Sequence, residues 1–495
     1  MQMHELTARR HESRTHAQRV SNSAERGAAV FSLFLIVVAA TIIGAGVVAF
    51  IQLTQTNPLT VSFLEDTPPE LSWQDGPRGL GAEPVHVVLT ASDKNSGLDE
   101  VIVRVSQQNQ PKELVRKSFG AGPIHDETID VTISPKELGF REGNVELQVL
   151  AFDKSLWSNG ARISKIMEVN YLKPQITVLT PQQNGVLGGS ELVFYRVTGK
   201  TPDAQGVLGQ GSLYNGFKAK GWDPAFNSRD NLYVAFYPIP ASFNVDSDKM
   251  QLVARDNLGN AATAPFNYRV RSRRWSTFRV SLTEQSAAAI KESLQRYAQH
   301  ENLPVRTTGS LVTDVKALLK ALAVSDEGFI ATALSESSPD RLWKGAFIPP
   351  VPSSPNNSVG DQRTVMIGDQ EIVKGPATGV RFPVSRRTSV IAGNSGKVVF
   401  IGELGLLGNT IVIDHGFGLS TIYGHLSNVA VQRGASVEKN QIIGSTGNSG
   451  FAQGEEVYFE TRLHGVAVSP NEWWDETWVT DHIENKVAFV KQEIG

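Results

Sequence analysis

The most restrictive feature of the sequence is an uninterrupted apolar segment near the N-terminus. Residues Ala28–Ile51 carry no charge, and Ser32 and Thr41 are the only polar side chains among them. At about 1.5 Å per residue, a helix of this length reaches about 36 Å, which is enough to cross the roughly 30 Å hydrocarbon core of a bilayer. A signal-peptide apolar region is shorter, and no small-x-small cleavage site follows Ile51. The segment therefore predicts a transmembrane helix over 28–51, with a buried core helix as the alternative.

The charges on either side of this segment predict its orientation. Five arginines precede it, whereas the 20 or so residues after it contain three acidic side chains and no lysine or arginine. Because basic residues stay on the cytoplasmic side, residues 1–27 are expected to form a short cytoplasmic tail. About 440 residues would then lie outside the cytoplasm. The pattern predicts a single-pass protein of the inner (cytoplasmic) membrane, with its bulk in the periplasm or another extracytoplasmic space.

The composition excludes several classes of protein. Lys and Arg number 47 against 50 Asp and Glu, for a net charge of −3, so a basic nucleic-acid binder is not expected. The chain has no cysteine, which excludes thiol catalysis, Cys-ligated zinc and disulfides and leaves His, Asp and Glu as metal ligands. Hydrophobic residues make up 40% of the chain and charged residues 20%, which excludes a wholly disordered chain.

Short alternating apolar segments, separated by Gly, Pro, Asn and Asp, fill residues 59–172 and 173–271. Strands at this spacing are typical of antiparallel sandwiches, so each range is predicted to form an immunoglobulin-like β-sandwich. Both ranges contain a strand that ends in Ala-x-Asp and is followed by a turn with an asparagine, which indicates a weak internal repeat. The two aspartates, Asp153 and Asp256, are expected to cap these turns, and calcium binding is the alternative.

The pattern changes to helical spacing over 282–334. Ser286–His300 is Ala-rich with interspersed Lys, Glu and Arg, and Leu311–Ala323 has apolar residues at helical intervals. Thr283 is placed to cap the first helix. These segments predict a short helical connector rather than a catalytic site. Strands joined by glycine turns then predict a C-terminal antiparallel β-domain over 340–480, so the whole chain is expected to be mainly β.

The C-terminal strands carry a specific set of motifs. Between Gly402 and Asp475 the chain contains GNTIVIDHG, Y-x-HLS, V-x-x-G-x-x-V-x-x-x-Q-x-I-G and STGNSG. In these motifs the segment resembles the M23 (LytM-like) family of peptidoglycan metalloendopeptidases. The resemblance implies the antiparallel β fold of that family for residues 340–480. For an active member it also implies zinc-dependent hydrolysis of a peptide bond in the peptidoglycan cross-link.

The metal-binding motifs of this family are changed in the present sequence. Active members hold zinc with the His and Asp of an H-x-x-x-D motif and with one His of an H-x-H motif. The first motif aligns here with Ala377 and Arg381, and the two His of the second align with Glu456 and Tyr458. His425, of the Y-x-HLS motif, is the only retained family position. The resemblance therefore implies a divergent member without the zinc ligands.

These replacements predict a domain without a metal. Ala377 has no lone pair, and Arg381 carries a fixed positive charge that repels a dication. Tyr458 is a poor ligand while its phenol is protonated, and the ordinary pKa of a phenol is about 10. No cofactor is therefore expected, although active relatives use zinc. We expect an ion pair between Arg381 and Glu456, joined by Tyr458, to fill the metal position.

Three groups have alternative interpretations. Glu456, His425, His464 and Asp414 would have to converge to form an unorthodox zinc site. His425 is either a polar contact for a peptide in the groove or a remnant that packs beside its strand neighbours. Trp473–Trp474 either closes the small β core or forms an exposed carbohydrate platform.

The predicted function is that of a membrane-anchored, non-catalytic M23-like protein of the cell envelope. Its partners would be peptidoglycan, another cell-wall hydrolase or an envelope complex, because the resemblance includes catalytically inactive members that activate amidases. The sandwiches would act as spacers or docking modules. One alternative is an active zinc metalloendopeptidase with an unorthodox site. The other is a structural or adhesive envelope protein whose sandwiches do the binding.

Overall fold

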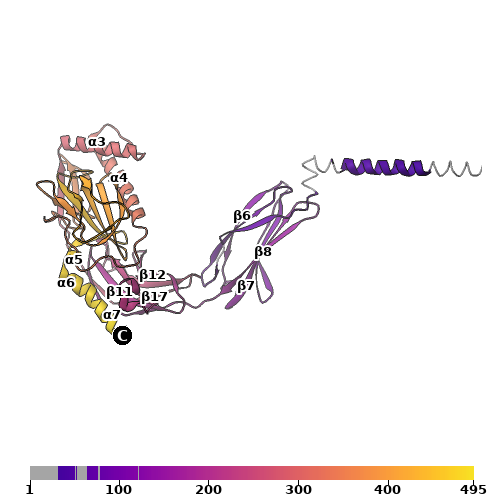
Figure 1. The fold of residues 1–495 in the computed structure, drawn as a ribbon, viewed down its shortest axis with the longest axis horizontal. Coiled ribbons are helices and arrows are strands. Elements are labelled where there is room, and N and C mark those ends of the chain that lie inside the picture. The colour runs from indigo at the N-terminus through magenta and orange to yellow at the C-terminus, as the bar shows by residue number, and fades with distance from the viewer. Residues whose placement is uncertain (1–31, 51, 53–63, 76–77, 121, 495) are drawn as a thin grey trace, which may run out of the picture. The chain divides into compact units, whose positions relative to one another are not determined.

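The computed structural model describes residues 32–50, 52, 64–75, 78–120 and 122–494. The described residues are mainly β, as predicted. The chain divides into two compact units, Met1–Asn170 and Tyr171–Gly495, which can be followed by their colours in Figure 1. The predicted cytoplasmic tail, residues 1–27, and both ends of the predicted transmembrane segment lie outside the described residues.

The apolar segment near the N-terminus forms a helix, Ser32–Phe50. With 19 residues, it is long and apolar enough to cross a membrane by length and composition. Its large side chains are exposed rather than packed in a protein core, and Ile42 and Ile43 are both 66% exposed. The buried-core alternative is therefore wrong, whereas the orientation of the helix stays a prediction.

The first unit contains two sheets. One has three strands in the order β1-β3-β6, and the other has five in the order β2-β8-β7-β4-β5. The strands are β1 Glu70–Asp75, β2 Gly79–Leu80, β3 Val85–Ser92, β4 Leu98–Gln107, β5 Gln110–Ser118, β6 Asp126–Ile133, β7 Gly143–Asp153 and β8 Gly160–Val169. Burial alternates along them, as in β3, where Val87, Leu89 and Ala91 are buried between more exposed neighbours. The immunoglobulin-like assignment of 59–172 stays a prediction.

Turns after two of the strands have the same construction. Asp153 Oδ1 accepts the backbone N–H of Asn159 at 2.8 Å, and Asp256 Oδ1 accepts that of Asn260, also at 2.8 Å. In both turns the asparagine amide donates to the second carboxylate oxygen. Two further buried carboxylates lie within 4.8 Å of Asp153, and these too accept backbone N–H groups. Both aspartates therefore cap turns, as predicted.

The second unit begins with the other predicted sandwich. Its two sheets have the strand orders β14-β15-β11-β9 and β13-β12-β16-β17, and β10 pairs with β18 beside them. The strands are β9 Gln175–Val178, β10 Gln183–Val186, β11 Ser190–Thr198, β12 Pro202–Gly209, β13 Ser212–Asn215, β14 Phe217–Lys218, β15 Leu232–Pro238, β16 Met250–Asp256, β17 Ala261–Pro265 and β18 Tyr268–Arg271. Both sheets contribute to one buried core, with Tyr195 and Tyr237 from the first and Val207 and Leu252 from the second.

Strand β15 is buried on both faces. Every residue of its sequence, LYVAFYP, is buried. From Leu232 to Tyr237, alternate side chains pack in the sandwich core, and the others pack in a second core with Phe417 and Trp473 of the C-terminal region. The strand pattern predicts 173–271 as a separate module. The structure instead joins it to the C-terminal domain, because a continuously apolar strand has to be covered on both faces.

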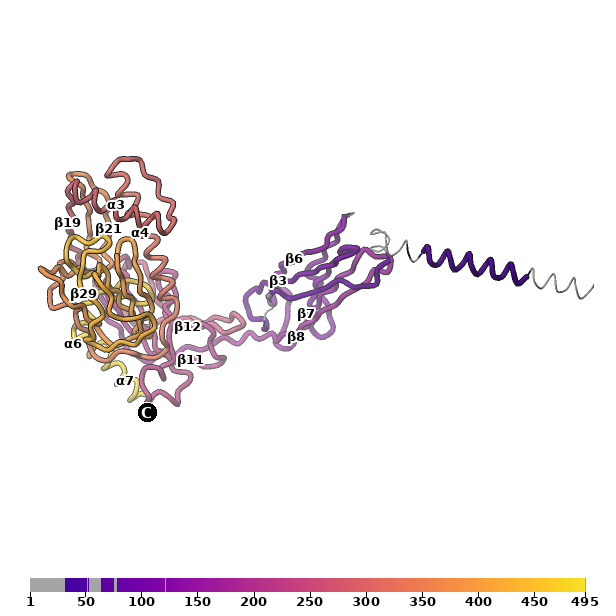
Figure 2. Tube along the Cα trace, turned by 45° about the horizontal axis from the view of Figure 1, so that its top comes forward, coloured from indigo at the N-terminus to yellow at the C-terminus, as the bar shows by residue number. Residues whose placement is uncertain are grey.

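Two helices and a small sheet form the next layer. The helices α3 Glu284–His300 and α4 Leu311–Ala333 share a core with the sheet β19-β20-β21. Its strands are β19 Thr277–Leu282, β20 Gln362–Ile367 and β21 Gln370–Pro376. Thr283 Oγ1 accepts the N–H of Ser286 at 3.1 Å, which confirms the predicted cap. Figures 1 and 2 both show this layer at one end of the second unit. The helices are present as predicted, but they belong to an α/β layer rather than to a simple connector.

The C-terminal domain is built on one large sheet. Its strand order is β22-β30-β26-β25-β24-β28, with β31 beside β30, and a smaller sheet has the order β23-β29-β27. The strands are β22 Val380–Pro383, β23 Ser389–Ile391, β24 Gly396–Leu404, β25 Gly408–Gly416, β26 Leu419–Leu426, β27 Asn428–Val429, β28 Ser436–Val437, β29 Ile442–Ser445, β30 Glu456–Leu463 and β31 Val466–Val468. Three helices follow: α5 Pro470–Trp474, α6 Glu476–Val479 and α7 Asn485–Ile494. Trp473 on α5 is fully buried, so this ring closes a core and is not an exposed platform.

Candidate functional site

The sheet register brings the changed motif positions together. Strands β22 and β30 are antiparallel neighbours, with Arg381 opposite Tyr458. Glu456 and Tyr458 are two residues apart on β30, so their side chains share one face of the sheet. His425 lies at the end of β26, on the other side of β30. Ala377 precedes β22 and lines the same cavity as Arg381, His425 and Tyr458.

The expected ion pair between Arg381 and Glu456 is present. Arg381 Nη1 lies 3.2 Å from Glu456 Oε1, and the two side chains are only 7% and 4% exposed. Burial raises the pKa of Glu456, and the positive charge of Arg381 acts in the opposite direction. The positions that the resemblance aligns with metal ligands thus hold a buried cation and a buried carboxylate in direct contact.

Tyr458 does not join this pair. Its hydroxyl donates to Glu460, whose carboxylate also accepts from Thr378 Oγ1 and from Arg462 Nε. Arg462 Nη1 in turn donates to Glu327 of α4 at 2.6 Å. Burial raises the pKa of Tyr458, and the charge of Glu460 raises it further, so the phenol stays protonated. The tyrosine therefore belongs to a second network, because its hydroxyl points toward the glutamate two residues along the strand.

His425 is a buried neutral imidazole. Its Nδ1 lies 2.9 Å from the carbonyl oxygen of Ser449, which can only accept, so Nδ1 carries the proton and Nε2 holds a lone pair. Burial lowers the pKa of His425 to about 3, and the charge of Arg381 lowers it further. Nε2 lies 3.6 Å from Glu456 Oε1 and has no hydrogen-bond partner within the described part of the chain. The imidazole ring packs against Tyr458, with 5.6 Å between ring centroids.

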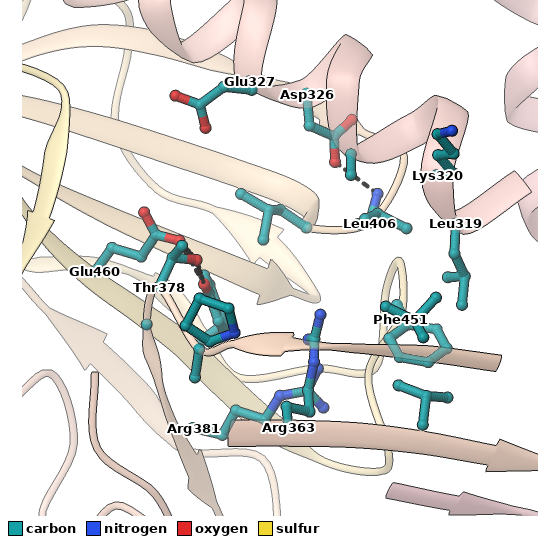
Figure 3. Close-up of a pocket in the computed structure, with 18 of the residues that line it drawn as sticks. Leu319, Lys320, Asp326, Glu327, Arg363, Thr378, Arg381, Leu406, Phe451 and Glu460 are labelled. Atoms are coloured by element: carbon teal, nitrogen blue, oxygen red, sulfur yellow. Dashed lines mark hydrogen bonds between the residues drawn. The ribbon is translucent and has the colours of Figure 1, made fainter. Parts of the chain in front are cut away.

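These residues lie at a cavity of about 700 Å³. Its walls come from α4, from β20 to β22, from β30 and from the loops that contain Leu406 and Phe451. Figure 3 shows Arg363 and Arg381 on one side of the cavity, with Asp326 and Glu327 of α4 on the opposite side. The sequence pattern of 282–334 predicts a connector without a site role. The structure corrects this prediction, because α4 forms a wall of the cavity.

The donor atoms at these positions do not fit a zinc ion. Ala377 offers a methyl group, and Arg381, which the resemblance aligns with the carboxylate of the family motif, offers a guanidinium. The other residues of the proposed unorthodox site lie elsewhere: Asp414 Oδ1 accepts from Ser337 Oγ at 2.6 Å, and His464 Nε2 lies 3.0 Å from the carbonyl oxygen of Phe236. Within the residues that the structure describes, these two side chains do not line the cavity.

Comparison with known proteins identifies the family of this region. Residues 375–470 match Peptidase family M23, which confirms the M23 domain implied by the motifs. Over 89 residues the chain is 39% identical to Stage II sporulation protein Q of Bacillus subtilis, covering 18% of this chain and 31% of that protein. Over 93 residues it is 33% identical to the DD-carboxypeptidase/endopeptidase Mpg of Neisseria meningitidis serogroup B, covering 19% and 21%.

A third relative is named as an activator of a hydrolase. Over 95 residues the chain is 34% identical to the Murein hydrolase activator EnvC of Escherichia coli, covering 19% of this chain and 23% of that protein. The chain therefore spans less than a third of the length of each of these three relatives. Each of these alignments covers less than a fifth of this chain, and the residues before 375 lie outside the match to the family.

Proposed function

We propose that this chain, whose residues 375–470 form a peptidase family M23 domain, is a non-catalytic protein of the cell envelope. It binds peptidoglycan peptides in the cavity of that domain and thereby regulates a cell-wall hydrolase or an envelope complex. The observation that carries this proposal is the buried Arg381–Glu456 ion pair at the metal-ligand positions. A dication placed there would face a guanidinium that does not deprotonate.

The surroundings of the ion pair support a binding role. The cavity of about 700 Å³ has the size of pockets that enclose small ligands, so the loss of the metal ligands has not closed the groove. The name of the EnvC relative, a murein hydrolase activator, shows that one protein with a similar segment acts on a hydrolase. Regulation through a bound partner needs a shaped surface but no metal.

The N-terminal helix supplies the location. A helix that is apolar enough to cross a membrane, preceded by arginines, would place residues 1–27 in the cytoplasm and the M23 domain in the periplasm. There the domain would meet peptidoglycan and the hydrolases that act on it. The first sandwich then lies between the membrane helix and the second unit in the chain order.

The test measures zinc and hydrolysis on the full chain in detergent. We expect no stoichiometric zinc by elemental analysis, no release of fragments from isolated sacculi with or without added zinc, and co-sedimentation with those sacculi. A variant that combines Ala377→His, Arg381→Asp, Glu456→His and Tyr458→His serves as the control, because it restores the family ligands and should bind zinc. Stoichiometric zinc together with cleavage by the unmodified chain would show that it is an active metalloendopeptidase. Absence of sacculus binding would contradict the proposed binding of peptidoglycan peptides.

A further inference from the structure

The cavity contains a cation that the family motifs do not explain. Arg363 lies on β20, outside the matched segment, and its side chain lines the cavity beside Arg381 (Figure 3). Among the described residues its guanidinium has neither an ion pair nor a hydrogen bond. Burial lowers the pKa of Arg363, and the neighbouring charge of Arg381 lowers it further. A guanidinium stays charged in proteins, and Arg363 is half-buried beside a second guanidinium, so an anion that approaches both would stabilise them.

The nearby carboxylates do not supply that anion. Glu456 is paired with Arg381, and Glu460 accepts from Arg462. Asp326 accepts the backbone N–H groups of Gly405 and Leu406 at 2.8 and 2.7 Å. Six basic side chains line the cavity against four acidic ones. The cavity lining therefore has an excess of positive charge. Glu327 is paired with Arg462 and Glu371 is exposed, so Arg363 is the lining guanidinium without an ion pair among the described residues, beside three lysines, Lys316, Lys320 and Lys374, that also lack one.

Other lining groups show what kind of anion would fit. His425 Nε2, buried beside Arg381 and Glu456, is an acceptor that lacks a donor among the described residues. Leu319, Leu406 and Phe451 provide an apolar wall. The last residue of a peptide combines a carboxylate, an N–H group on the same Cα and a small side chain. Such a residue satisfies the guanidinium, the imidazole nitrogen and the apolar wall together, whereas inorganic phosphate has no apolar group for the wall formed by Leu319, Leu406 and Phe451.

We propose that the cavity binds the C-terminal carboxylate of a peptidoglycan stem peptide, with Arg363 as its main cationic partner and Arg381 beside it. In this arrangement the terminal N–H donates to His425 Nε2. The ligand carboxylate then supplies a second negative charge for two guanidiniums, of which only Arg381 has a carboxylate partner, Glu456. The inference rests on the proposed function for the choice of a stem peptide over other peptides, but the assignment of a carboxylate follows from the cavity itself.

The experiment uses the full chain in detergent and isothermal titration calorimetry. The probe is diacetyl-L-lysyl-D-alanyl-D-alanine, compared with the same tripeptide as its C-terminal amide. We expect the amide to bind at least 10-fold more weakly than the acid. In Arg363→Met the affinity for the acid should fall by a similar factor, and the difference in affinity between acid and amide should disappear. Arg363→Lys keeps a positive charge and should retain part of that difference.

Arg279→Met is the matched control, because Arg279 is exposed on the neighbouring strand β19 and does not line the cavity. It should bind the acid within 2-fold of the unmodified chain. Equal affinity for acid and amide, unchanged binding by a folded Arg363→Met, or equal competition by inorganic phosphate would overturn the proposal. Equal binding of the L-alanyl-L-alanine isomer would overturn the stem-peptide class in favour of a protein C-terminus. The zinc and digestion measurements test the proposed function separately. A failure of carboxylate binding can therefore be distinguished from a failure of the proposed non-catalytic function.

Discussion

Removing Glu456 from the buried ion pair tests whether burial of Arg381 makes its unpaired charge destabilising. In Glu456→Ala the guanidinium of Arg381 keeps its charge but loses the carboxylate oxygen that lies 3.2 Å from Nη1. Because the Arg381 side chain is only 7% exposed, water does not replace that oxygen freely. Leaving a buried charge unpaired costs about 3–5 kcal/mol, against under about 1 kcal/mol for an exposed pair. The free energy of unfolding of the second unit should therefore fall by about 3–5 kcal/mol.

Urea unfolding followed by tryptophan fluorescence measures this loss, since six of the eight tryptophans lie in Tyr171–Gly495. The matched control is Asp230→Ala in the same unit, because Asp230 is paired with Lys220 at 3.4 Å but is 76% exposed. That variant should lose under about 1 kcal/mol. The double variant Arg381→Met/Glu456→Leu removes both charges and should regain most of the stability. Equal losses in the two single variants would refute the argument from burial.

Four further predictions address stability, metal, domain division and orientation. Burial raises the pKa of Glu472 to about 8, so the folded chain holds a proton that the unfolded chain releases above about pH 4.5. The stability of the second unit should therefore fall between about pH 4.5 and 8, by at most about 1.4 kcal/mol per pH unit, and urea titrations of Glu472→Gln should show a flatter slope. EDTA should leave the calorimetric melting temperature unchanged, and a fall that zinc reverses would contradict the metal-free site. Limited proteolysis should cut first near Tyr171–Pro174, at the boundary between the two units, so a single undivided resistant core would count against two units. A reporter fused after Gly495 should be active only if it functions outside the cytoplasm, and activity of a cytoplasmic-only reporter would reverse the topology.

The fold could be predicted wherever the local pattern and the long-range packing agree. The apolar helix and α3 are such cases, since an uncharged segment and a Thr283 cap are local signals. The second sandwich is a case where they differ. Its strand spacing predicts a separate module, but β15 is apolar at successive positions rather than at alternate ones. That continuous run was the available signal that a second layer covers the sheet.

The residues of the site that lie within the family motifs could be predicted, whereas those outside the motifs could not. The ion pair between Arg381 and Glu456 could be predicted because the family resemblance aligns both residues with metal-ligand positions, which have to converge in the fold. The spacing of Glu456 and Tyr458 adds that these two side chains lie on one face of a strand. Arg363 lies on a strand outside the motifs, and only the tertiary fold places it beside Arg381. Glu460 continues the same alternation along β30. That spacing was a usable signal for its bond with Tyr458.

The double burial of β15 makes the region that matches peptidase family M23 depend on residues outside it. Phe417 lies in the matched residues 375–470 and shares a core with Leu232, Val234 and Phe236 of β15. A fragment limited to 375–470 would therefore expose to water an apolar surface that β15 covers in the full chain. The segment that matches the family and the compact unit Tyr171–Gly495 thus have different boundaries.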